Sequence, residues 1–237
     1  MRIIGHRGAR GEAPENTLGG FRYIQDLGIR AVEFDVRQLK DDQLIIMHDD
    51  QFIRTTGQSH DLYACSTADL KAFDQAYIWQ DWTDFEITPS LQDSLQLMKN
   101  FEHIEVEVKA VDSLDEAQHL VEHLQQALIG FSNSAIITSF DLKIHQALQQ
   151  QQSTFKHGLL IEDEVGHQAI DQALELNCCQ IGWKNSLATE QLIKDTLEQG
   201  LNVSVWTVNE IERAKQLRDL GIQGLITDFP KMMLQHL

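Results

Sequence analysis

Short apolar runs alternate with amphipathic segments along most of the chain. The runs predict buried strands at 2–6, 31–36, 104–109, 135–139, 157–161, 179–183, 202–208 and 224–228. Between the later runs, apolar residues recur at helical spacing, which predicts helices over 114–129, 141–151, 166–176, 187–200 and 209–220. Strands that alternate with helices are typical of a parallel sheet. Eight such strands in a chain of 237 residues favour an α/β fold of the TIM (β/α)8 barrel type.

One further apolar run, 44–48, follows the strand that begins at residue 31 too closely for a helical crossover. Only residues 40–43 separate the two runs, whereas a parallel connection needs about a dozen residues. The run is therefore interpreted as the return arm of a β-hairpin with its turn at 40–43. In that register Asp35 lies opposite His48, with their Cβ atoms about 5 Å apart.

The segment from about 50 to 102 has no strong periodicity and contains four aromatic residues, Tyr77, Trp79, Trp82 and Phe85. It is predicted to be an insertion above the barrel mouth, where it could act as a lid and influence substrate selectivity. No repeat or linker divides the sequence, so residues 1–237 are expected to form a single barrel domain.

Composition and charge narrow the range of partners. The formal net charge of −17 argues against a nucleic acid or an anionic membrane surface, because such partners select basic patches. No run reaches the roughly 18 apolar residues of a membrane span, and no signal peptide is apparent. Cys65, Cys178 and Cys179 match no zinc-binding spacing and fit a reducing compartment. These features predict a cytoplasmic protein without stable membrane insertion and leave its oligomeric state open.

Two predicted strands carry charged side chains on a single face. In VEFDV, strand periodicity places Glu33 and Asp35 on one face, and in IEVEVK it places Glu105, Glu107 and Lys109 together. Unpaired anions in a core would be very costly, which favours a functional or metal-bound role over a solvated acidic face. Carboxylates on neighbouring strands suit Mg²⁺ or Ca²⁺, and the alternative is ion pairing between glutamate and lysine.

His6 and His48 each end an apolar run. Either one alone fits a structural role. As a pair beside a carboxylate-bound cation, they could supply the proton acceptor and the proton donor that phosphodiester cleavage requires. Arg7 and Lys109 could bind phosphate oxygens, with surface salt bridges as the alternative.

With these residues in view, the sequence resembles the glycerophosphodiester phosphodiesterase family. The family pattern His-Arg, Glu-x-Asp, His is met by His6-Arg7, Glu33-Phe34-Asp35 and His48-Asp49. Further blocks that resemble the family follow in the expected order: APENTLGGF (13–21), RTTG (54–57), TPSLQDSL (88–95), EVK (107–109), TSF (138–140), VWTVN (205–209) and GLITDFP (224–230). Each block alone is a weak signal, but all of them in order cover nearly the whole chain.

The resemblance implies a TIM barrel, a divalent cation, and hydrolysis of small glycerophosphodiesters to sn-glycerol 3-phosphate and an alcohol. Carried over by position, His6 and His48 would act as general acid and base, and the metal ligands would be Glu33, Asp35 and Glu107. Glu105 stands where relatives often carry an amide, so it could compete with Glu107 for the ion.

The resemblance also implies that Arg7 and Lys109 bind the substrate phosphate. Trp206, at the end of the seventh barrel strand, matches a family aromatic residue beside the substrate, although packing at the strand end is an equal alternative. Glu15 is a candidate to orient Arg7. Asn16 or Thr17 is suited to cap the following helix.

Two other functions stay open at this point. A lysophospholipase D would use similar residues on a lipid and would need an acyl groove within 50–102. The lack of a basic patch argues against it. A non-catalytic barrel that binds a cation or a partner would be favoured by loss of a site residue, and none is lost. Whether water or the glycerol 2-hydroxyl attacks phosphorus is not decided by the sequence.

Overall fold

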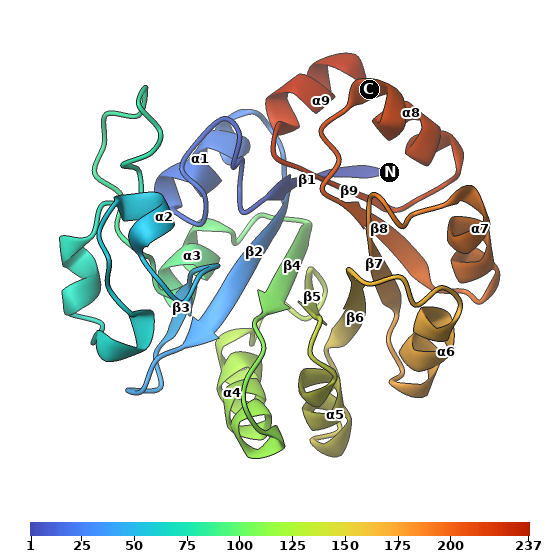
Figure 1. Ribbon diagram of the computed structural model, residues 1–237, viewed down its shortest axis with the longest axis horizontal. Coiled ribbons are helices and arrows are strands. Elements are labelled where there is room, and N and C mark those ends of the chain that lie inside the picture. The colour runs from blue at the N-terminus through green and yellow to red at the C-terminus, as the bar shows by residue number, and fades with distance from the viewer.

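Eight parallel strands close into a barrel in the computed structural model, which describes residues 1–237 (Figure 1). The strands run in the order β1-β9-β8-β7-β6-β5-β4-β2, and pairing of β1 with β2 closes the ring. Their bounds are β1 Arg2–His6, β2 Ala31–Gln38, β4 His103–Val108, β5 Ala135–Ser139, β6 Lys156–Ile161, β7 Gln180–Lys184, β8 Asn202–Trp206 and β9 Gly224–Thr227. All eight predicted strands are present, with ends that differ by one or two residues at most, and the TIM barrel prediction is confirmed.

Helices surround the barrel on its outside (Figure 1). They are α1 Leu18–Asp26, α4 Leu114–Ala127, α5 Leu142–Gln150, α6 Gln168–Glu175, α7 Glu190–Glu198, α8 Ile211–Asp219 and α9 Pro230–His236. The five predicted helices are confirmed, each slightly shorter than expected. Of the two candidate caps for α1, Thr17 fills the role, since its side chain accepts a hydrogen bond from the Gly20 backbone N–H at 3.0 Å. None of the helices combines the length and the apolar character needed to span a bilayer.

Strand alternation separates an apolar outer layer from an interior that holds both the charged residues and a small apolar cluster of Ile4, Ala31 and Ile226. Val32, Phe34 and Val36 on β2 are fully buried in a cluster of 27 residues that packs the outer face of the sheet against the helices. A second cluster of 20 residues does the same around β6 to β9. Glu33 and Asp35 therefore project to the inside of the barrel.

The hairpin exists, but the predicted pairing of Asp35 with His48 is wrong by one residue. Strand β3 (Leu44–Ile46) pairs antiparallel with β2 so that Val36 lies opposite Ile46. The Met47 backbone N–H then donates to the Asp35 carbonyl at 3.0 Å. The reason is a three-residue loop: Leu39 and Gln43 still pair, through a 2.9 Å hydrogen bond, and residues 40–42 alone make the turn. His48 follows beyond the end of the paired strand.

The segment from about 50 to 102 lies at one side of the molecule, next to β3 and α1 (Figure 1). It contains α2 (Ile53–Thr56), the 3-10 helices η1 (Leu62–Ala64) and η2 (Asp69–Ala72), and α3 (Leu91–Leu97). A separate apolar cluster of seven residues supports it: Leu39, Ile45, Met47, Phe52, Leu62, Leu70 and Phe73. The segment thus packs on the hairpin through its own core, and its role as a lid stays a prediction.

Candidate active site

Three carboxylates converge at the carboxyl end of the barrel. Glu33 and Asp35 come from β2 and Glu107 from β4, and the parallel register places Asp35 directly beside Glu107. One oxygen of each of the three lies within 4.8 Å of the others, and all three side chains are buried. Strand periodicity and sheet register are sufficient to assemble this group.

The carboxylate group has the properties of a cation site. Glu33 Oε1 is buried without a hydrogen-bond partner. Burial, and then the charges of Asp35 and Glu107, raise the pKa of Glu33 well above its usual value. Burial and the charge of Asp35 likewise raise the pKa of Glu107. Oxygen ligands that repel one another and include an unpartnered atom fit a divalent cation such as Mg²⁺ or Ca²⁺.

Glu105 does not belong to this group. It lies opposite Glu33 in the register, one pair deeper in the barrel than Asp35 and Glu107. Its Oε1 faces His103 Nε2 at 3.0 Å. The structure therefore brings Glu107 into the ligand cluster and places Glu105 one pair deeper, where its Oε2 is buried without a partner and its side chain lines the cavity beside the cluster.

His6 is held by an aspartate that sequence reasoning missed. Its Nδ1 lies 2.6 Å from Asp228 Oδ1, while its Nε2 is 3.9 Å from Glu33 Oε2. Burial lowers the pKa of His6, and the hydrogen bond to Asp228 partly offsets that shift. A signal was available, because Asp228 directly follows the last barrel strand and so lies at the same edge as His6, which ends the first.

His48 is held in the same way. Its Nδ1 lies 2.6 Å from Asp49 Oδ1, and Arg54 Nε donates to the other oxygen of Asp49 at 2.5 Å. Burial opposes ionisation of Asp49, but the contacts with His48 and Arg54 outweigh it and hold the pKa of this carboxyl below its usual range. The side chain of His48 is 34% exposed. Each histidine thus presents one ring nitrogen to a carboxylate and keeps Nε2 for other contacts.

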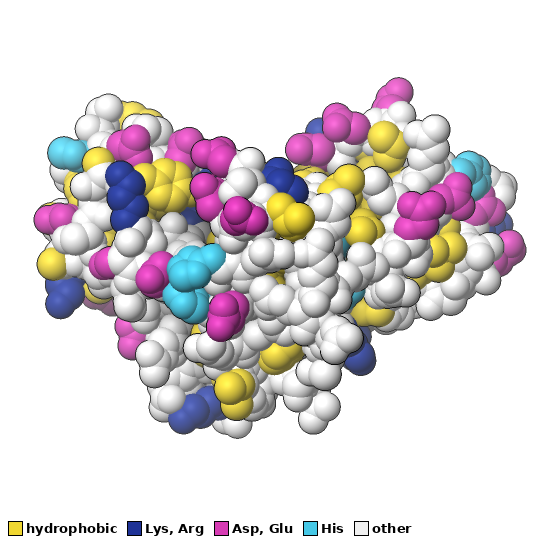
Figure 2. Space-filling model, turned by 90° about the horizontal axis from the view of Figure 1, so that it is seen from below, with side chains coloured by type: hydrophobic (Ala, Val, Ile, Leu, Met, Phe, Trp, Pro, Cys, Tyr) yellow, Lys and Arg dark blue, Asp and Glu magenta, His cyan; other side chains and the backbone are white.

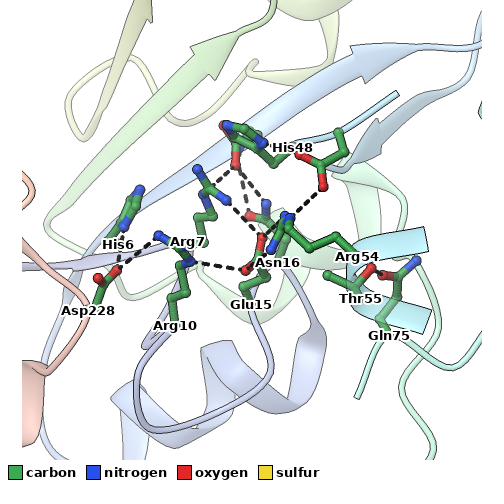
Figure 3. A network of polar contacts seen from close by, with 12 residues as sticks. His6, Arg7, Arg10, Glu15, Asn16, His48, Arg54, Thr55, Gln75 and Asp228 are labelled. Carbon is green, nitrogen blue, oxygen red and sulfur yellow. Dashed lines mark hydrogen bonds and ion pairs between the residues drawn. The ribbon is translucent and has the colours of Figure 1, made fainter. Parts of the chain in front are cut away.

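Glu15 lies at the centre of a charged network between the two histidines (Figure 3). It accepts hydrogen bonds from Arg7 Nη1 at 2.9 Å and from both terminal nitrogens of Arg54 at 2.6 and 2.7 Å. Arg10 Nε is 3.3 Å from Glu15, and Arg10 Nη1 is 4.0 Å from Asp228. Glu15 therefore does contact Arg7 as expected, and it also links the surroundings of His6 to those of His48.

Glu15→Gln is expected to lower the free energy of unfolding by about 2–3 kcal/mol. Removing one partner of a buried pair typically costs about 3–5 kcal/mol, and partial exposure of Arg10 and Arg54 reduces that figure. Urea denaturation measures the change. The exposed Glu175→Gln variant, expected to differ from wild type by less than about 0.5 kcal/mol, is the control. Equal stability of the two variants would show that the network is not structural.

The two predicted phosphate-binding cations lie against the carboxylates. Lys109 Nζ is 2.6 Å from Asp35 Oδ1 and also contacts Glu107. Arg7 Nε is 3.2 Å from Asp35 Oδ2, and the Arg7 backbone N–H donates to Glu33 at 3.0 Å. Lys109 and Arg7 together outweigh burial and keep the pKa of Asp35 well below its usual range. Two cationic side chains are therefore held beside the three carboxylates.

Asn16, considered as a helix cap from the sequence, has a different role. Its backbone adopts a left-handed conformation with φ 55°, and its Nδ2 donates to Asp35 Oδ2 at 2.7 Å. Because Thr17 caps α1, Asn16 is available to fix the orientation of the Asp35 carboxylate.

A small cavity of about 20 Å³ lies beside the carboxylates, enough for about one water molecule. It is lined by His6, Glu33, Glu105, Glu107, Thr138, Leu160, Trp206 and Ile226. Trp206 ends β8, donates through Nε1 to the Gly182 carbonyl at 3.0 Å, and meets Phe140 edge-on. The two interpretations of Trp206 are therefore compatible, since it packs at the strand end and also lines the cavity.

Comparison with known proteins agrees with this geometry. The sequence model of the glycerophosphoryl diester phosphodiesterase family matches residues 6–232. The chain belongs to this family. It is therefore an enzyme, a glycerophosphodiester phosphodiesterase, as the resemblance implied.

Relatives and a solved structure match along nearly the whole chain. The glycerophosphodiester phosphodiesterase of Caldanaerobacter subterraneus is 24% identical over 238 residues, covering 98% of this chain and 96% of that protein. Human lysophospholipase D GDPD1 is 24% identical over 270 residues, covering 99% and 85%. The structure of an Oleispira antarctica phosphodiesterase in complex with the product sn-glycerol-3-phosphate has a TM-score of 0.85 and 21% identity, covering 100% and 96%. That structural likeness shows the shared fold.

Proposed function

We propose that this enzyme hydrolyses small glycerophosphodiesters to sn-glycerol 3-phosphate and an alcohol, using a divalent cation and two histidines. The observation that carries the proposal is the convergence of Glu33, Asp35 and Glu107 beside two histidines that are each held by an aspartate. The product bound to the Oleispira antarctica phosphodiesterase supports this substrate class.

Glu33, Asp35 and Glu107 would hold the cation. Their donors are all carboxylate oxygens, which favours Mg²⁺ or Ca²⁺ over softer ions. A bound cation of this kind would polarise the phosphate and neutralise charge on its oxygens. Asn16 and Lys109 orient the Asp35 carboxylate from the other side.

His6 and His48 would transfer protons on opposite sides of the phosphorus. Each ring has its Nδ1 occupied by an aspartate, which fixes the tautomer and leaves Nε2 as the atom that exchanges a proton. One histidine would accept the proton of the attacking hydroxyl, and the other would donate a proton to the leaving alcohol oxygen. This division of roles applies whether the hydroxyl belongs to water or to the glycerol.

Arg7 and Lys109 would bind the phosphate oxygens. Both already stand at the carboxylates, so a phosphate next to the bound cation would lie within their reach. Arg7 provides a planar pair of donors and Lys109 a compact charge. Glu15 would hold the Arg7 guanidinium in place, and Trp206 would contact the substrate from the cavity wall.

Two observations bear on substrate size. The net charge of −17, with many acidic side chains on the face in Figure 2, opposes approach to an anionic bilayer. Lysophospholipase D activity is the second candidate. It is favoured by large exposed apolar side chains in the insertion, namely Ile53, Tyr77, Ile78, Phe85 and Ile87, and by the human relative. We favour the small, soluble ester because the net charge of −17 repels an anionic bilayer, whereas these apolar side chains occupy only the insertion.

The test compares glycerophosphocholine with lysophosphatidylcholine by coupled detection of choline, which is released with glycerol 3-phosphate from the first substrate and with lysophosphatidic acid from the second. We expect kcat/KM to be higher for glycerophosphocholine. A tenfold preference for lysophosphatidylcholine, about 1.4 kcal/mol of transition-state energy, would make the insertion an acyl site. Tyr77→Ser is the matched variant, expected to leave turnover of glycerophosphocholine unchanged and, in the acyl-site case, to lower only that of the lipid. No product from either substrate would contradict the proposed substrate class.

We further infer that the protein acts in the cytoplasm. Cys65, Cys178 and Cys179 are all free thiols, which supports a reducing compartment. Fractionation of the source cells tests this, and recovery of the enzyme outside the cytoplasmic fraction would contradict it.

A further inference from the structure

A second group of potential metal ligands lies outside the barrel, away from the carboxylates. It consists of His145 on α5, His157 on β6, and Cys178 just before β7, all of them buried. The two Nδ1 atoms are 3.0 Å apart, and Cys178 Sγ lies 3.5 Å from His157 Nδ1 and 3.8 Å from His145 Nδ1. Donor atoms from a helix, a strand and the connection before β7 therefore lie close together.

The group occupies a seam in the apolar layer between the sheet and the helices. The larger apolar cluster reaches Ile144 and Leu148 on α5, and the second cluster begins at Leu159 on β6. In Figure 1, α5 lies on the outside of β5 and β6. Aliphatic side chains would be the usual filling of such a layer, so two imidazoles and a thiol facing one another need a specific reason.

The distances lie within about 0.3 Å of those in the ligand shell of a tetrahedral zinc ion. Zn–N bonds of about 2.0–2.1 Å and a Zn–S bond of about 2.3 Å place two nitrogens about 3.3 Å apart and nitrogen and sulfur about 3.5 Å apart. The ring of His145 is also oriented as in metal sites, because its Nε2 faces the Ser139 carbonyl at 3.1 Å and its Nδ1 points to the group.

An access path leads to the group from the amino-terminal end of the barrel. A groove of about 400 Å³ is lined by His157 and Cys179 together with Lys156, which begins β6, and with residues of the loop before it, among them Thr154 and Phe155. Because the carboxylates lie at the carboxyl ends of the strands, this opening is at the opposite end of the barrel from the active site. Water from the groove could complete a fourth coordination position.

We propose that His145, His157 and Cys178 bind one zinc ion, with water as the fourth ligand. Binding would release the Cys178 thiol proton to solvent, and His157 would carry its remaining ring proton on Nε2 so that Nδ1 is free to coordinate. The competing role is a metal-free core cluster in which His157 Nδ1–H donates to His145 Nδ1. The ion would tie α5 to β6 and to the segment before β7, which makes it a stabilising site.

Cobalt titration of the chelator-treated full-length protein tests the proposal, because Co²⁺ bound to a thiolate gives a characteristic near-ultraviolet charge-transfer absorption. With excess Mg²⁺ present to occupy the site of Glu33, Asp35 and Glu107, we expect this absorption to saturate at one equivalent of Co²⁺ and to disappear when one equivalent of Zn²⁺ is added. Cys178→Ser should lose the absorption, and Cys65→Ser should keep it. Absence of the absorption in the wild type, or its persistence in Cys178→Ser, would overturn the proposal.

Two further measurements distinguish this site from other positions that could bind Co²⁺ or Zn²⁺. Asp42, His119 and His123, of which the first two are exposed and His123 is half-buried, could also bind Co²⁺, but the group contains no thiol and would not produce the absorption. His157→Gln, checked for folding by circular dichroism, should also lose the absorption. Zn²⁺ should raise the melting temperature of the wild type but not that of Cys178→Ser. An equal rise in both would assign the stabilisation to another site.

Discussion

Chelation followed by dialysis is expected to lower release of glycerol 3-phosphate by about 10²-fold or more, because a catalytic cation supplies several kcal/mol of charge stabilisation. Hard cations held by a few carboxylates exchange with solvent, so Mg²⁺ or Ca²⁺ should restore the activity. The measurement is turnover of glycerophosphocholine before treatment, after dialysis and after addition of each ion. Full activity in the chelated enzyme would contradict the proposed role of Glu33, Asp35 and Glu107.

A matched pair of variants locates the third ligand. Glu107→Gln should reproduce the loss caused by chelation, since Glu107 lies within the ligand group. Glu105→Gln changes a residue on the same strand in the same way, but its carboxylate faces His103 below the site. We expect it to retain most of the activity. Loss of activity in Glu105→Gln but not in Glu107→Gln would indicate that the ion binds one register pair deeper in the barrel.

His6→Ala and His48→Ala are each expected to lower kcat by about 10²–10⁴-fold, the usual cost of removing a positioned acid or base. The reason is that both rings are held by an aspartate through Nδ1 and present Nε2 as the exchanging atom. The measurement is kcat at saturating glycerophosphocholine with the restoring cation present.

His167→Ala serves as the control for the histidine variants, because His167 is exposed and pairs with Asp195 at the surface. It should behave as wild type. A decrease of less than about fivefold in His6→Ala or His48→Ala would remove that residue from the proton transfers. The circular dichroism spectrum of each variant should equal that of the wild type, which would show that a loss of activity does not result from unfolding.

The barrel could be predicted from the sequence because buried parallel strands appear as short, nearly continuous apolar runs. The runs at Ala31–Gln38 and His103–Val108 also show alternation of charge on one face, which is sufficient to bring Glu33, Asp35 and Glu107 together once the strands are parallel. The hairpin register could not be obtained in the same way. Gln43 is polar and looks like part of the turn, yet its backbone pairs with Leu39.

Several site residues have hydrogen-bond partners far away in the sequence, and these partners could not be predicted. Asp228 is 222 residues from His6, and Arg54 is 39 residues from Glu15, so no local spacing connects them. The one indication in the sequence was the position of Asp228 directly after the last barrel strand, which places it at the same edge of the barrel as His6. The donors His157 and Cys178 are 21 residues apart and meet through tertiary packing alone, which is why cysteine spacing indicated no metal.

The three-residue loop at 40–42 is exposed, but its length is constrained by the strand that follows it. Surface loops generally tolerate insertions and deletions. Here the number of residues sets the phase of the returning strand, and a shift of one residue turns every following side chain to the opposite face. His48 lies only two residues beyond β3, so it inherits that phase. The loop therefore constrains His48 through its length, and its composition is constrained at Asp42, whose φ of 63° is adopted readily by few residues other than Gly, Asn and Asp.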